Sequence, residues 1–249
     1  MTQTTVPVIF DLDGTLVDPA GGITGGIAAA LAELGLPVPE KSRMDAMVGP
    51  KLSHSLTEIA GVPAALLDDV IRIYRVHYAS TGIAQSRLYP GIRGLLEDFV
   101  AAGRPIAVAT QKPEGLARTV LEHHGIAGLF HSIRGSAADE SATGPRAASV
   151  PEGKSGIVAA ALSDLAAAAP ALAGQAVMVG DRAQDVAGAA ANGLDCIGVG
   201  WGFAPDGELH EAGAVEVVHD AAALHATITR LSERPGTTAL NEVPADGNV

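Results

Sequence analysis

Short apolar runs alternate with helical segments along most of the chain, and this alternation constrains the fold more than any other feature. Such runs, bounded by glycine or aspartate, are typical of buried parallel strands joined by crossover helices. They lie at Val6–Phe10, Ile106–Thr110, Phe130–Ile133, Ala176–Gly180, Cys196–Val199 and Val215–Val218. The sequence therefore predicts an α/β fold with a Rossmann-like, doubly wound parallel sheet.

A helical insertion separates the first two apolar runs. Between Gly21 and Leu88 the apolar residues keep a helical spacing, and the Tyr89-Pro90-Gly91 turn then leads back to the sheet. We therefore expect a core made of residues 1–17 and 90–231, with a small α-helical segment at residues 18–89 inserted after the first strand.

Other segments are predicted by composition and spacing. Leu66–Tyr78 and Ser155–Ala167 are expected to be helices. Ala137–Gly153 is small, polar and interrupted by Pro and Gly, which predicts an exposed loop. Residues 232–249 have little apolar content and are expected to form a flexible tail.

Charge and composition exclude several classes of protein. The balance of 16 Lys+Arg against 28 Asp+Glu gives a net charge of −12, which disfavours binding to nucleic acid. The single cysteine, Cys196, excludes an intramolecular disulfide framework, so a cytoplasmic location is expected. We find neither a signal peptide nor an apolar window long enough to span a membrane. A monomer and a homodimer both remain open.

Two acidic pairs follow predicted strands. Asp11 and Asp13 come directly after the first strand, and Asp181 and Asp185 follow the Ala176–Gly180 strand. Ligands of open α/β sheets bind beyond the carboxyl ends of the strands, where these residues fall. Two simpler interpretations remain open: an ordinary Asp-Gly turn for the first pair and a helix N-cap for the second.

The carboxylates predict a metal site if the two strands are neighbours. Up to four carboxylates would then converge and repel one another strongly unless a cation lay between them. Mg²⁺ prefers oxygen ligands and retains several waters, which suits such a site.

Polar and basic residues supply possible contacts for an anion. Thr110 ends the second predicted strand, and Lys154 precedes a predicted helix. An ordinary strand threonine and a solvated lysine are the alternatives. The chain has only four lysines, and Lys51, Lys112 and Lys154 all fall near the loops expected to face a ligand.

Four motifs in order along the chain resemble the haloacid dehalogenase superfamily, and more narrowly its phosphoglycolate phosphatase-like branch. The resemblance extends to about Leu231. The motifs are Asp11-Leu12-Asp13-Gly14-Thr15-Leu16-Val17-Asp18, Val108-Ala109-Thr110-Gln111-Lys112-Pro113, Lys154, and Val179-Gly180-Asp181-Arg182 with Asp185.

The resemblance implies a catalytic mechanism. Asp11 would attack phosphorus to form an aspartyl-phosphate, while Asp13 would protonate the leaving alcohol and then activate water. Thr110 and Lys154 would bind the phosphoryl oxygens. Mg²⁺ would be held by Asp11, the backbone carbonyl of Asp13, Asp181 and, nearby or through water, Asp185. The inserted segment, residues 18–89, resembles the small α-helical cap of the family. The residues expected to bind substrate are Gly14, Thr15, Gln111, Lys112 and, from the cap, Lys51.

The sequence thus predicts a Mg²⁺-dependent phosphohydrolase that acts on a small phosphate monoester. Phosphoglycolate-like molecules are the first candidates for the substrate. A nucleoside monophosphate or a sugar phosphate is the nearest alternative. A phosphonatase would need a Schiff-base lysine in the cap, either Lys51 or Lys41. A signalling receiver domain is disfavoured because its phosphorylated aspartate lies on a different strand from its acidic pair. A non-catalytic phosphate-binding protein, or a phosphotransfer protein acting on protein substrates, is the alternative of another class.

Overall fold

The computed structural model describes residues 6–137, 153–168, 170 and 175–233. Six parallel strands form one sheet in the order β5-β4-β1-β6-β7-β8, which confirms the predicted doubly wound fold. The strands are β1 (Val8–Phe10), β4 (Ile106–Pro113), β5 (Ser132–Ser136), β6 (Val177–Gly180), β7 (Asp195–Val199) and β8 (Glu216–Val218). β5 begins two residues later than its apolar run, since its register with β4 starts at the pair Ala107 and Ser132.

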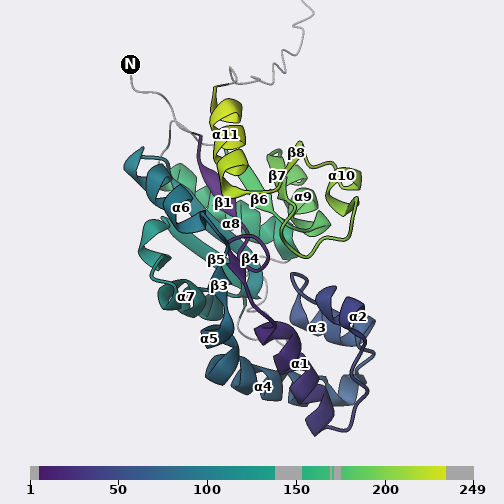
Figure 1. Cartoon of the computed structure of the whole chain (residues 1–249). Coiled ribbons are helices and arrows are strands. Elements are labelled where there is room, and N and C mark those ends of the chain that lie inside the picture. The colour runs from purple at the N-terminus through teal and green to yellow at the C-terminus, as the bar shows by residue number, and fades with distance from the viewer. Residues whose placement is uncertain (1–5, 138–152, 169, 171–174, 234–249) are drawn as a thin grey trace, which may run out of the picture.

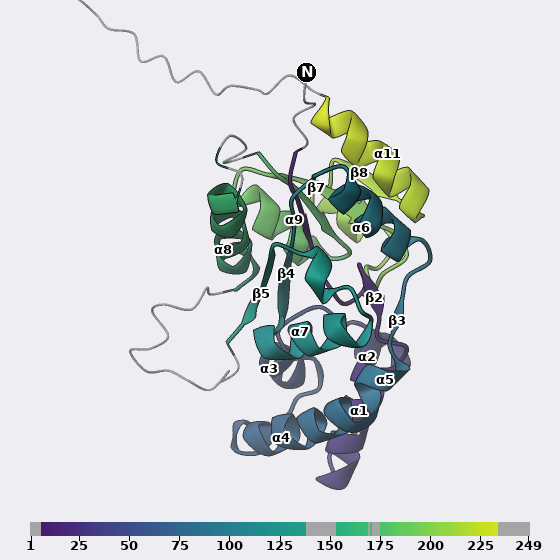
Figure 2. The ribbon, with the colours of Figure 1, turned by 90° about the vertical axis from the view of Figure 1, so that its left-hand side faces the viewer.

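Helices cover both faces of the sheet, because side chains alternate along each strand. Val8 and Phe10 point into one apolar core, whereas Ile9 points into the other. The first core contains residues of α6 (Ile92–Ala101), α7 (Glu114–His123) and α11 (Ala221–Ser232). The second contains residues of α8 (Gly153–Ala168), α9 (Ala183–Ala190) and α10 (Glu208–Glu211). Figure 2 shows α8 on one side of the sheet and α6 and α11 on the other.

The inserted segment is helical, as predicted, and lies at one end of the sheet (Figure 1). Some of its turns are π-helical rather than α-helical. Its helices are α1 (Gly22–Glu33), α2 (Lys41–Asp45), α3 (Leu52–His54), α4 (Leu67–His77) and α5 (Ile83–Gln85), with π-turns at Ser55–Ile59 and Tyr78–Gly82 and a 3₁₀ turn at Ala64–Leu66. A further 3₁₀ turn, Ala127–Leu129, precedes β5.

A short antiparallel ribbon connects the inserted helices to the sheet. β2 (Val17–Asp18) pairs with β3 (Arg87–Leu88), so the chain leaves and returns side by side. The sequence did not predict this ribbon, because two residues are too few to show the alternation that marks a strand.

The predicted loop and tail fall largely where the structure is not described. Residues 138–152 of the loop and residues 234–249 of the tail lie outside the described residues. Among the helices that are described, none combines the length and the apolar character needed to cross a membrane.

Candidate active site

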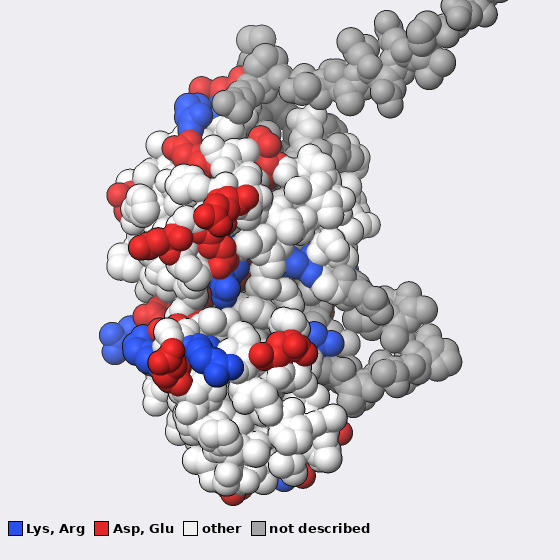
Figure 3. Space-filling model, turned by 90° about the vertical axis from the view of Figure 1, so that its right-hand side faces the viewer, with Lys and Arg blue, Asp and Glu red and all other residues white. Residues whose placement is uncertain are grey.

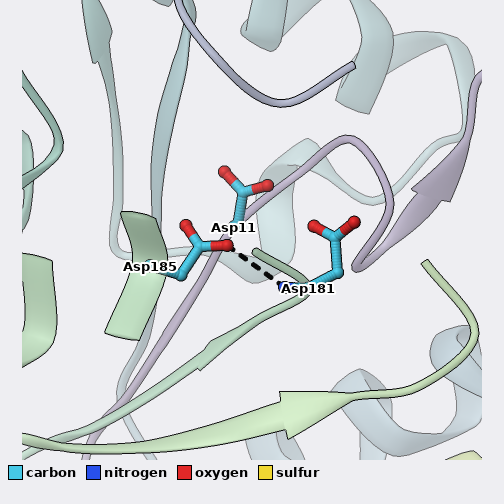
Figure 4. Close-up of side chains that lie close together, drawn as sticks. All are labelled: Asp11, Asp181 and Asp185. Atoms are coloured by element: carbon cyan, nitrogen blue, oxygen red, sulfur yellow. Dashed lines mark hydrogen bonds between the residues drawn. The ribbon is translucent and has the colours of Figure 1, made fainter. Parts of the chain in front are cut away.

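The two acidic pairs meet because β1 and β6 are neighbours in the sheet. Phe10 pairs with Val179, and the backbone N–H of Asp11 donates to the Val179 carbonyl at 2.9 Å. One carboxylate oxygen from each of Asp11, Asp181 and Asp185 lies within 4.8 Å of the others, and all three residues are buried. Figure 4 shows the three carboxyl groups gathered at the strand ends. We call Asp11, Asp181 and Asp185 the carboxylate cluster.

Asp181 is fixed by contacts with two loops. Its Oδ2 accepts a hydrogen bond from the backbone N–H of Phe203 at 2.8 Å, and its Oδ1 lies 3.4 Å from the Thr15 hydroxyl that donates to it. Gly14 has φ +89°, and a Cβ there would lie 2.1 Å from Asp181 Oδ2. A Cβ on Gly202 would lie 2.3 Å from Asp181 Cβ. Both glycines are therefore needed for this carboxylate to reach the site.

Lys154 joins the carboxylate cluster from the first turn of α8. Its Nζ lies 2.5 Å from Asp11 Oδ1 and 2.6 Å from Asp185 Oδ1. Asp185 Oδ2 in turn accepts hydrogen bonds from the backbone N–H groups of Asp181 and Arg182, at 3.1 and 3.0 Å. The lysine and the three carboxylates thus form one buried electrostatic network.

Burial and mutual repulsion shift the pKa values in this network. The pKa of Asp181 is raised well above its usual value by burial and by the charges of Asp185 and Asp11. Burial also raises the pKa of Asp185 to about 6, although Lys154 opposes this shift. The pKa of Lys154 is raised because attraction to Asp11 and Asp185 outweighs the opposing effect of burial. The acids therefore favour either a proton or another cation.

Asp13, two residues after Asp11, pairs with a lysine at the end of β4. Its Oδ2 lies 2.7 Å from the Nζ of Lys112, and that Nζ sits 4.5 Å from the ring centre of Tyr78. The pKa of Lys112 is raised, because burial, which lowers it, is outweighed by attraction to Asp13. Asp13 Oδ1 has no hydrogen-bond partner among the described residues. Lys112, predicted to bind substrate, is thus engaged by Asp13.

The other predicted substrate residues lie around the same strand ends. Thr110 is buried, and its hydroxyl accepts a hydrogen bond from the Lys112 backbone N–H at 3.3 Å. Gln111 donates from Nε2 to Gln184 Oε1 at 2.9 Å, which links the end of β4 to α9. Lys51 precedes α3 and is partly exposed.

A pocket lies between the inserted helices and the end of β4. It is lined by Asp13, Ile23, Gly49, Pro50, Leu52, Tyr74, Arg75, Gln111, Lys112, Pro113 and Leu116. Arg75 is not among the residues predicted from the sequence, because only the fold decides which part of the insertion faces the strand ends. The alternation of apolar residues in α4 could at most have shown which helix face is buried. We call this cavity the cap-side pocket.

Arg182 connects the inserted segment to the core. Its Nη1 donates to the Val48 carbonyl at 2.8 Å, and its Nε donates to Glu208 Oε1 at 2.9 Å. On the face shown in Figure 3, charged side chains of both signs gather across the middle of the molecule. The sequence analysis gave Arg182 no role, although it lies inside the fourth motif.

The donor set of the carboxylate cluster fits a hard divalent cation. Three buried carboxylates supply oxygen ligands, and glycines at two neighbouring positions leave the space that Asp181 occupies. Burial, and to a lesser extent the charge of Asp11, raises the pKa of Asp185, so a cation beside it would stabilise the ionised carboxylate. Fold and site together define an α/β protein in which acidic residues at the carboxyl ends of two central strands face an inserted helical segment.

Comparison with known proteins identifies the family. The family model described as haloacid dehalogenase-like hydrolase matches residues 8–199. The chain therefore belongs to the haloacid dehalogenase-like hydrolase family, which confirms the resemblance seen in the four motifs. A predicted phosphatase from Clostridium acetobutylicum superposes with a TM-score of 0.79 at 32% identity, covering 91% of this chain and all of that one (100%).

Several curated relatives carry names of phosphate chemistry. The chain is 39% identical over 229 residues to the tyrosine-protein kinase PtkA of Mycobacterium tuberculosis, covering 92% of this chain and 72% of that protein. It is 35% identical over 217 residues to a 5'-nucleotidase of Pseudomonas aeruginosa, covering 87% and 92%. It is 30% identical over 248 residues to a phosphoglycolate phosphatase of Rhodospirillum rubrum, covering 96% of each. The phosphatases among these relatives indicate an enzyme, a phosphoric monoester hydrolase.

Proposed function

We propose that this protein is a Mg²⁺-dependent phosphatase that cleaves a small phosphate monoester through an aspartyl-phosphate on Asp11. Phosphoglycolate-like molecules are the first candidates for the substrate. One observation carries the proposal. Asp11 lies within a buried network of Asp181, Asp185 and Lys154, whereas Asp13, only two residues away, lines the cap-side pocket. The network suits a phosphoryl group, and the pocket suits its leaving group.

The residues divide the reaction into two steps. A carboxylate oxygen of Asp11 attacks phosphorus and the ester P–O bond breaks, while Asp13, which must be protonated at this step, gives that proton to the leaving alcohol. Asp13 then removes a proton from the water that attacks the aspartyl-phosphate, so inorganic phosphate leaves, Asp11 is again a carboxylate and Asp13 is again protonated. Lys154 and Thr110 would bind phosphoryl oxygens and balance their negative charge.

Asp11, Asp181 and the backbone carbonyl of Asp13 would hold the Mg²⁺ ion, with Asp185 near or bound through water. When bound, the ion would supply positive charge that lets the carboxylate and the phosphate approach each other. The fit of the carboxylate cluster to a hard cation supports this assignment. We also propose that residues 18–89 act as a cap domain on a core formed by residues 1–17 and 90–231. The helices of this segment over the strand ends support that division.

A phosphate-release screen tests the proposal. Wild-type protein and the Asp11→Asn variant would be assayed with and without Mg²⁺ on phosphoglycolate, nucleoside monophosphates and sugar phosphates. We expect Mg²⁺-dependent release by the wild type, fastest on phosphoglycolate, and no release by the variant. Equal activity of the two proteins would refute the role of Asp11. A faster reaction on a nucleotide or a sugar phosphate would overturn only the choice of substrate.

Phosphotransfer to protein tyrosine is a second candidate function, favoured by the similarity to PtkA. This phosphotransfer would use the same carboxylate cluster at the strand ends, with ATP as the phosphoryl donor. The distinguishing assay incubates the protein with γ-labelled ATP, Mg²⁺ and a tyrosine-containing protein. Label retained on tyrosine supports the transferase, whereas label recovered only as inorganic phosphate supports the hydrolase.

A further inference from the structure

The charged side chains of the cap-side pocket come from two parts of the molecule, the strand ends of the sheet and the inserted helical segment. Asp13 and Lys112 belong to the strand ends, and Arg75 belongs to α4 of the inserted segment. Asp13 and Lys112 pair at 2.7 Å with both side chains buried, so their charges largely compensate each other. Arg75 adds a second positive charge to the lining. Among the described residues, the lining therefore carries two basic side chains and one acidic side chain.

The position of Asp13 identifies this pocket as the leaving-group side. In the proposed reaction Asp13 protonates the departing oxygen, so that oxygen must lie within hydrogen-bonding reach of its carboxyl group. The rest of the leaving group must then extend from Asp13 into the pocket. Ile23, Leu52 and Leu116 offer apolar surface there for its carbon atoms.

Other basic residues of the inserted segment lie elsewhere. Lys41 pairs with Asp45 on the surface, and Arg72 pairs with Asp69. Arg43 donates to the Ile59 carbonyl. Lys51 belongs to the loop beside the pocket, but only its neighbours Gly49, Pro50 and Leu52 line the cavity. Of the Lys and Arg residues described between 18 and 89, Arg75 is the one on the pocket wall.

We propose that Arg75 determines specificity by binding a second anionic group, a carboxylate or a phosphate, on the leaving alcohol. The planar guanidinium offers paired N–H donors that match the two oxygens of either group. The inference rests on the proposed phosphatase function and narrows it. The substrates are phosphate monoesters whose alcohol part is itself negatively charged, rather than phosphate monoesters of nucleosides or neutral sugars.

Matched substrates test the inference directly. The kcat/KM would be measured for 2-phosphoglycolate, for its uncharged amide, and for ethylene glycol bisphosphate, which carries a second phosphate instead of the carboxylate. For the wild type we expect a preference of about 10- to 100-fold for a charged substrate over the amide, the range of one hydrogen-bonded charge pair. The better of the two charged substrates tells which anion is recognised.

Three variants test which residue causes the preference for a charged substrate. Arg75→Gln should lose the preference, mainly through a higher KM, and hydrolyse the amide within about twofold of the wild type. Arg75→Lys should restore part of it, and Arg72→Gln, one turn away on the exposed surface, should keep it whole. Equal loss by Arg75→Gln on the charged and uncharged substrates would overturn the inference, as would a wild type without preference for charge.

Binding to a variant that cannot react separates this inference from the proposed function. Calorimetric titration of 2-phosphoglycolate into Asp11→Asn and into Asp11→Asn/Arg75→Gln should show about 10- to 100-fold weaker binding to the double variant. If the wild type hydrolyses none of the esters but this difference persists, the phosphatase function fails and the anion site stands. Equal affinities would overturn the anion site even if the phosphatase is active.

Discussion

The two sides of the candidate active site are built differently. In the carboxylate cluster each acid is buried and held by the backbone N–H groups, the threonine hydroxyl or the lysine around it. In the cap-side pocket the paired Asp13 and Lys112 are also buried, but the remaining wall is a mixture of apolar side chains and the half-buried Arg75. The first side is fixed by the ends of the central strands, whereas the second depends on how the inserted helices pack. Changes to the first should abolish the reaction, and changes to the second should redirect or weaken it.

The largest effect should come from Asp11→Asn. Loss of the nucleophile should reduce kcat by at least about 10⁴-fold, the scale seen when other nucleophiles are removed. The fold should survive, because the amide has nearly the same shape and removes one of three mutually repelling acids. Steady-state phosphate release and thermal unfolding check both parts, with the exposed substitution Asp69→Asn as the control. A variant with more than a tenth of the wild-type kcat would contradict the division between the two sides.

Asp13→Asn should have the next largest effect, and it should depend on the leaving group. Loss of the proton donor should lower the rate of phosphoryl transfer from an alkyl phosphate by about 10²- to 10⁴-fold. The first turnover of p-nitrophenyl phosphate should fall much less, since nitrophenolate leaves without a proton. Rapid-mixing measurements of the nitrophenolate burst test this, and equal losses for both esters would assign Asp13 a different role.

Removal of the metal should expose the pH dependence of the carboxylate cluster. Asp185 has a pKa of about 6 in the folded protein, above the usual value of 3.8, so the metal-free folded state binds a proton that the unfolded chain releases. Its contribution to metal-free stability should therefore fall as the pH rises from about 4 to 6. The apparent Mg²⁺ affinity should rise over the same window, by about tenfold per pH unit for each proton displaced.

Calorimetric unfolding in chelator, compared between the wild type and Asp185→Asn, isolates this group from the other carboxylates. The stability difference between the two proteins should change in that window in favour of the variant as the pH rises. A difference that is flat, or that changes in the opposite direction, would show that Asp185 is not protonated in the metal-free fold.

The smallest effect should come from Gly49→Ala in the loop of the cap-side pocket. Gly49 has φ +102°, and a Cβ would lie 3.1 Å from Arg182 Cγ, so the loop would have to shift away from the core. We expect a loss of about 1 kcal/mol in stability. KM should rise a few-fold, and kcat should stay within about twofold.

Gly25→Ala in α1 is the matched control, because nothing lies within 4 Å of a Cβ there and alanine favours a helix. It should leave KM unchanged and stabilise slightly. If Gly49→Ala lowered kcat as severely as Asp13→Asn, the two sides would not be separable.

Much of the core could be predicted from the sequence, since its signals are local. Buried strands appear as short apolar runs, and the acids that follow them must lie at strand ends whatever the rest of the chain does. The β2–β3 ribbon could not be predicted, because two residues carry no periodicity. The pairing of Asp13 with Lys112 was equally hidden, since nearly a hundred residues separate them and three of the four lysines lie near proposed ligand loops.

By itself, the sequence determined the parallel α/β sheet, the helical insertion and the family, because apolar periodicity and motif spacing are properties of the linear chain. Only the tertiary structure decided that β1 and β6 are neighbours, so that Asp11, Asp181 and Asp185 meet. It also decided that Asp13 pairs with Lys112, and that Arg75 rather than Lys51 lines the cap-side pocket. The physical reason is that strand order and the packing of an inserted segment depend on contacts between residues far apart in sequence. Local propensity carries no record of those contacts.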